Sequence, residues 1–172
     1  MYVWSEGEGF RISMVGDLAY LKIQDPAGSG DGQRRLQVLE EAASSAARIL
    51  DRGFRPLGLV LDLRRAGEIL DEREQAVVGG LLARWDRANL TISLLTRKRA
   101  ELMANLVFIA DAHARTTARV VTSLQEAENW VGADSSSGLA SKRRRTASEG
   151  KRKSDSRRKP TLRLVSSTDE PV

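Results

Sequence analysis

Three carboxylates near the middle of the chain have the chemistry to hold a metal ion or to take part in phosphoryl transfer. Asp62 lies in the apolar run LGLVLDL, and Asp71 and Glu72 follow after a short polar loop. Carboxylate oxygens are ligands that Mg²⁺ prefers, but a phosphoryl-transfer site of this kind also needs an acidic pair after the first strand and a lysine after a late strand. The segments QDPAGSG and VVTSLQ supply neither. We therefore predict no metal site, no cofactor and no catalytic residues here.

The other residue types with chemical potential are few. His113 is the only histidine and lies near the expected end of a helix, which favours a structural or solvent-facing role. The stretch GSGDG at 28–32 lacks the Gly-Lys-Ser/Thr and Gly-x-Gly-x-x-Gly series that place backbone amides around phosphates, so it indicates a flexible connection. The chain has no cysteine, which excludes disulfides and thiolate chemistry and fits a cytoplasmic setting. The sequence predicts that the protein is not an enzyme.

Two expected elements precede the carboxylates. Residues 10–23 alternate at period two on both sides of Gly16-Asp17, which predicts an antiparallel β-hairpin that turns at these two residues. Apolar residues at steps of three and four then predict a helix over 36–50, and Gly53 stands where a C-terminal cap is expected.

Repeated strand and helix units follow. Each unit has a short apolar run, typical of a strand covered on both faces, and then a segment with apolar residues on one helical face. Side chains that can cap each helix are Asp71 with Glu74, Thr96, and Ser123 with Glu126. The expected strands are at 57–63, 91–96 and 118–123, and the expected helices begin near residues 72, 97 and 124.

This order predicts an α/β domain over residues 1–132. Strand-helix-strand repeats imply right-handed crossovers and a mainly parallel sheet of four to five strands, with an N-terminal antiparallel hairpin strand and about four helices. Residues 133–172 are rich in Ser, Lys and Arg without apolar periodicity, which predicts a disordered basic tail. No apolar run approaches the roughly 20 residues that span a bilayer, so we expect a soluble, cytoplasmic protein without a transmembrane segment.

The positive charge is concentrated in this tail. Residues 133–172 contain eleven basic and five acidic residues, whereas residues 1–132 contain 17 basic and 18 acidic residues. The tail has no aromatic residue for base stacking, so it could bind nucleic acid without sequence preference, an acidic protein or an anionic membrane. Thr146 and Ser148 follow arginines and are candidate phosphorylation sites. The basic residues predicted to bind are Lys142, Arg143, Arg144, Arg145, Lys151, Arg152, Lys153, Arg157, Arg158 and Lys159.

The order of elements resembles the STAS superfamily, in particular the bacterial SpoIIAA-like (STAS/SEC14-type) domain. The resemblance covers about residues 9–132. It rests on the initial hairpin, the strand LVLDL, the helix that opens at Asp71, and the closing segment TSLQEAENWV, in which Ala127 and Trp130 correspond to core residues. It implies a regulatory domain, similar to anti-sigma factor antagonists, that binds a protein partner.

In those antagonists the helix opens with Asp-Ser-Ser-Gly-Leu, and one serine is phosphorylated. Asp62 and Asp71 match the strand-end and helix-start aspartates, but Glu72 and Arg73 stand where hydroxyl residues are expected. The usual phosphoacceptor serine is therefore absent. Glu72 either places a permanent negative charge where phosphoserine would, or merely complements the helix dipole together with Asp71. The resemblance implies a partner-binding surface of Asp62, Arg64, Arg65, Asp71, Glu72 and Arg73.

Three functions are compatible with these features. The first is a regulatory or scaffold protein that binds a protein partner through its folded domain and an acidic partner through its tail. The second, implied by the SEC14-type relatives, is a carrier of a small molecule or lipid in an apolar groove beside the helix at 102–109. The third is a nucleic-acid-associated protein that binds through its tail and oligomerises, for example as a homodimer, through its body. We take the first as the principal prediction.

Overall fold

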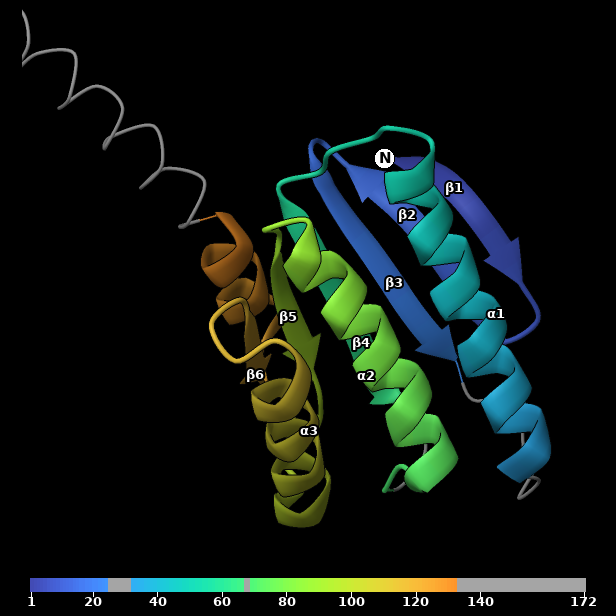
Figure 1. Cartoon of the computed structure of the whole chain (residues 1–172), viewed down its shortest axis with the longest axis vertical. Helices are drawn as coiled ribbons and strands as arrows, with labels where there is room; N and C mark the ends of the chain where they lie inside the picture. The colour runs from blue at the N-terminus through green and yellow to red at the C-terminus, as the bar shows by residue number, and fades with distance from the viewer. Residues whose placement is uncertain (25–31, 67–68, 133–172) are drawn as a thin grey trace, which may run out of the picture. The chain divides into compact units, whose positions relative to one another are not determined.

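In the part of the chain that the structure describes, the sheet has six strands. Each strand pairs with its neighbour in sequence, in the order β1-β2-β3-β4-β5-β6 (Figure 1). The structure is a computed structural model, and it describes residues 1–24, 32–66 and 69–132. Its strands are β1 (Tyr2–Gly7), β2 (Phe10–Val15), β3 (Leu18–Gln24), β4 (Gly58–Arg65), β5 (Thr91–Leu95) and β6 (Ala118–Val121). Its helices are α1 (Gly32–Asp51), α2 (Glu72–Arg87) and α3 (Ala100–His113), and residues 124–132 form a fourth, which we call the closing helix.

The N-terminal strands are antiparallel and the others are parallel. β1, β2 and β3 pair antiparallel, whereas β3, β4, β5 and β6 pair parallel. The turn between β2 and β3 is at Gly16-Asp17, as predicted, and Gly16 has a φ of 57°, which glycine adopts at no steric cost. The predicted α/β class with an antiparallel N-terminal hairpin is thus confirmed.

The sheet has more strands than the four to five predicted, because β1 was not expected. Most side chains of β1 are exposed or half-buried, so its sequence lacks the apolar alternation that identifies a strand. This strand forms by backbone pairing with β2, with Tyr2 opposite Met14 and Gly7 opposite Phe10. It is an edge strand with a register shift between Val3 and Ser5, an irregularity that is common at sheet edges.

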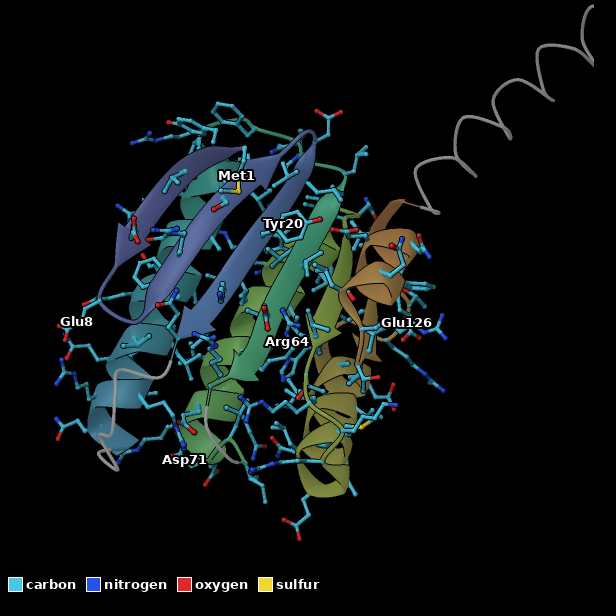
Figure 2. All side chains as sticks on the ribbon, turned by 180° about the vertical axis from the view of Figure 1, so that it is seen from behind. Met1, Glu8, Tyr20, Arg64, Asp71 and Glu126 are labelled. Carbon is cyan, nitrogen blue, oxygen red and sulfur yellow. The ribbon has the colours of Figure 1, made fainter. Side chains whose placement is uncertain are left out.

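Helices cover both faces of the sheet. α1, α2 and α3 lie on one face, as expected when right-handed crossovers join strands in consecutive order (Figure 1). The closing helix lies on the opposite face (Figure 2), where it packs against β4, β5 and β6. β4 is covered on both faces, as predicted, because Leu59 and Leu61 belong to the main core and Val60 packs with Val131 of the closing helix.

The predicted cap of α2 is confirmed. The Asp71 carboxylate accepts a hydrogen bond from the Glu74 backbone N–H at 2.9 Å, and the Glu74 carboxylate accepts one from the Asp71 backbone N–H at 2.8 Å. Ser123 Oγ likewise accepts from the Glu126 backbone N–H at 3.2 Å at the start of the closing helix. These local patterns need no tertiary context, because both partners lie within one turn.

The prediction that Thr96 caps α3 is wrong. α3 begins at Ala100, and its N-cap residue is Arg99, which makes no side-chain capping bond. The Thr96 backbone N–H donates to the Val121 carbonyl at 3.0 Å, which holds Thr96 at the end of the sheet and away from the helix start. Thr96 is separated from the start of α3 by three exposed basic residues, Arg97, Lys98 and Arg99.

The predicted tail lies outside the described residues, and so do Thr146, Ser148 and all ten basic residues named for it. Among the described residues, no helix is long and apolar enough to cross a bilayer.

Candidate functional site

The predicted partner-binding residues lie at the edge of the sheet where the parallel strands end. β3, β4 and β5 end at this edge, and α1, α2 and α3 begin there (Figure 1). Arg64 lies near the end of β4 and Asp71 at the start of α2 (Figure 2). In open α/β sheets, ligands bind outside the carboxyl ends of the strands. We call this region the carboxyl edge.

Asp62 is engaged by a neighbour on its own strand. Its carboxylate accepts two hydrogen bonds from the Arg64 guanidinium, at 2.9 and 2.7 Å, and a third from the Arg64 backbone N–H at 3.1 Å. The Asp62 side chain is 13% exposed and the Arg64 side chain 41%. The hydrogen bond to Asp62 raises the pKa of Arg64, so this guanidinium stays charged. Asp62 therefore orients Arg64 and is not a free carboxylate.

Asp62 and Arg64 line a basic pocket of about 300 Å³ together with Lys22, Arg65 and Arg97. Lys22 on β3 is opposite Asp62 in the parallel register, and Arg97 follows the end of β5. Of the residues that the structure describes, four cations and one carboxylate line the pocket. Sequence reasoning missed Lys22 and Arg97 as site residues, although each stands at or just after the end of a parallel strand, which is the available signal.

The residues predicted at the start of α2 line a different depression. Asp71 and Arg73 border a pocket of about 570 Å³ that also includes Gln37 and Glu40 of α1. Glu72 is exposed and lines neither this pocket nor the basic one. The six predicted residues therefore share one edge of the sheet but form two neighbouring surfaces.

A buried ion pair joins the starts of α1 and α2. Glu74 is fully buried, and its two carboxylate oxygens accept from the Arg35 guanidinium, one of them at 2.7 Å. The same carboxylate completes the α2 cap through Asp71. Sequence reasoning assigned Glu74 only this capping role, because the two side chains of the ion pair are 39 residues apart.

Two of the three carboxylates considered for a metal ion, Asp62 and Asp71, accept hydrogen bonds from other groups. Asp62 accepts from Arg64, and Asp71 accepts from the α2 backbone. In the part of the chain that the structure describes, no three His, Cys, Asp or Glu side chains form a group that could hold a metal ion. His113 is exposed at the end of α3, and its ring packs where a β-carbon on Gly79 would otherwise lie.

An apolar groove of about 380 Å³ lies on the sheet face that carries the closing helix. Tyr20 of β3, Val60 of β4 and Leu124 of the closing helix contribute to its lining. The carrier hypothesis instead expected a groove beside the helix at 102–109. That helix directs Leu102, Leu106 and Ile109 into the main core, where the protein's own side chains fill the space.

Tyr20, which lines this groove, is expected to make the free energy of unfolding depend on pH. Burial raises the pKa of Tyr20, and its hydrogen bond to Glu128, at 2.7 Å, raises it further. As the pH rises above the ordinary tyrosine pKa of about 10, the unfolded chain releases a proton that the folded protein retains. We expect the free energy of unfolding to fall more steeply above about pH 10 in the wild type than in Tyr20→Phe, as measured by urea unfolding. Parallel pH profiles would contradict this.

Comparison with known proteins assigns no family to the chain. It matches no protein-family model and no curated protein. The STAS resemblance therefore stays a prediction that rests on the order of elements.

Proposed function

We propose that the protein is a non-enzymatic regulatory or scaffold module that binds a protein partner through the carboxyl edge. The observation that carries this proposal is the gathering of exposed charged side chains from three segments at that edge. They are Arg65 at the end of β4, Glu72 and Arg73 at the start of α2, and Arg97, Lys98 and Arg99 before α3. None of these six forms an ion pair with another described residue.

Exposed charges without internal partners are suited to recognition. Charges across an interface accelerate encounter and select among partners more than they add affinity. The edge is also preorganised, because the Asp62 carboxylate fixes Arg64 and the Glu74–Arg35 pair fixes the starts of two helices. We propose a cytoplasmic partner with acidic groups opposite Arg65 and Arg97, and a basic tail that strengthens this attraction.

The test is a charge exchange at the start of α2 that keeps the net charge. The full-length protein carrying Glu72→Arg and Arg73→Glu is compared with the wild type in pull-downs from native lysate, after nuclease treatment and a high-salt wash. We expect at least about a tenfold loss of the retained partner, because charges that attract become charges that repel. Asp111→Arg with Arg115→Asp, an exchange of exposed residues at the other end of α3, is the control. Equal retention by all three proteins would contradict the proposal.

A second candidate function is a small-molecule carrier, which the apolar groove beside the closing helix favours. A carrier is expected to purify with a bound compound that native mass spectrometry of the full-length protein detects, and Leu124→Ser is expected to lose it. The nucleic-acid hypothesis depends on tail residues outside the described part of the chain, and no contact in the structure favours it.

A further inference from the structure

The basic pocket and the apolar groove are contiguous. Lys22, Asp62 and Arg64 line both of them. We infer that this continuous depression binds a small organic phosphate, with the phosphate group in the basic pocket and the apolar part in the groove. The inference rests on the two cavities and not on the binding of a protein partner, so either can fail without the other.

The excess of positive charge in the basic pocket favours the binding of an anion. Among the described residues, its lining carries four positive side chains and one carboxylate, and that carboxylate accepts hydrogen bonds from Arg64. The rest of the folded domain does not share this excess, since residues 1–132 contain 17 basic and 18 acidic residues. Lys22, Arg65 and Arg97 make no ion pair with any described residue. A phosphate dianion would relieve the repulsion among these cations through charge-assisted hydrogen bonds.

The groove supplies a surface for the uncharged part of the ligand. Tyr20 and Val60 face it from adjacent strands, and Leu124, which is 40% exposed, closes it from the closing helix. Glu128 also lines the groove, but its carboxylate accepts the Tyr20 hydroxyl hydrogen bond, which holds the Tyr20 ring in place. An apolar group of a few carbons would therefore contact an ordered, mostly apolar wall.

The shape of the site favours a small ligand over a polymer. The phosphate would enter a concave pocket formed by the ends of three strands, and not a flat basic stripe that follows a nucleic-acid backbone. The lining residues that the structure describes include no aromatic side chain on which a base could stack.

Calorimetric titration of the full-length protein at constant ionic strength tests the inference with three probes. They are inorganic phosphate, octyl phosphate below its micellar concentration, and octyl glucoside. We expect octyl phosphate to bind at least about tenfold more tightly than inorganic phosphate, because each methylene removed from water adds to affinity. Octyl glucoside, which lacks the charge, is expected to bind no more tightly than inorganic phosphate.

Variants separate the two halves of the site. Arg65→Gln with Arg97→Gln is expected to weaken both phosphates by about tenfold or more, and Leu124→Ser is expected to weaken octyl phosphate alone. Circular dichroism confirms that each variant is folded. Arg115→Gln, a change at an exposed residue that is not among the lining residues of either cavity, is expected to bind as the wild type does.

Three results would overturn the inference. The first is the absence of saturable binding of octyl phosphate to the wild type. The second is equal weakening by Arg115→Gln, which would show nonspecific attraction to positive charge. The third is equally tight binding of octyl glucoside, which would show that the basic pocket recognises no phosphate.

Discussion

Replacing Glu74 with glutamine is expected to lower the free energy of unfolding by about 3 kcal/mol. The Glu74 side chain is fully buried and accepts from both the Arg35 guanidinium and the Asp71 backbone N–H. Glutamine keeps the size of the side chain but removes its charge and replaces one acceptor by a donor. The Arg35 guanidinium would then lose its bidentate carboxylate partner. Chemical denaturation of the wild type and the variant measures the difference.

Glu72 provides the matched control. It lies in the same first turn of α2 and is exposed, so Glu72→Gln is expected to change the unfolding free energy by about 0.5 kcal/mol or less, through the helix dipole alone. If Glu74→Gln and Glu72→Gln change the free energy of unfolding equally, Glu74 stabilises the fold only through the helix dipole, and its ion pair with Arg35 has no net effect on stability. A double change to Met at both Arg35 and Glu74 is expected to lower the free energy of unfolding less than Glu74→Gln does, because both charges of the ion pair are then replaced by apolar groups.

Gly58→Ala is expected to destabilise the protein by about 2–3 kcal/mol. A β-carbon at Gly58 would overlap the Thr91 carbonyl oxygen of β5 and the Val131 side chain of the closing helix. The β5 backbone is held in the parallel ladder opposite Gly58 and cannot withdraw without breaking it. Thr91 Oγ1 also donates to the Val131 carbonyl at 3.3 Å, so the closing helix would have to shift as well. Thermal and chemical unfolding test this.

Gly80→Ala is the matched control, because it adds the same methyl group at a position where no neighbouring atom would clash with it. Gly80 is exposed within α2, and a β-carbon there would meet no atom within 4 Å. Alanine loses less conformational entropy in a helix, so this variant is expected to be more stable than the wild type by about 0.5–1 kcal/mol. Opposite signs for the two substitutions would confirm that Gly58 is required by the packing of the closing helix. Two changes of the same sign would contradict it.

The closing helix also belongs to the site proposed for the organic phosphate. Leu124 and Glu128 of this helix form one side of the apolar groove. A shift of the helix caused by Gly58→Ala would therefore also move one wall of the site proposed for the organic phosphate.

Much of the fold could be predicted from the sequence, because it depends on local patterns. The turn at Gly16-Asp17, the capping box at Asp71 and the burial of β4 on both faces each follow from residues within one turn or one strand. Edge strand β1 escaped prediction because its pairing uses backbone groups, which every sequence has, while its side chains stay mostly exposed.

The sequence by itself determined the α/β class, most of the elements, and the presence of charged residues where β4 ends and α2 begins. Only the tertiary structure decided how those charges are used. Asp62 is bonded to Arg64, Glu74 to Arg35, and Lys22 and Arg97 join Arg64 in one pocket. Asp62 and Arg64 share β4, but Glu74 and Arg35 lie on different helices, and the parallel register of the sheet brings Lys22 of β3 opposite Asp62. No local periodicity encodes that register, so the pocket appears only when the chain is folded.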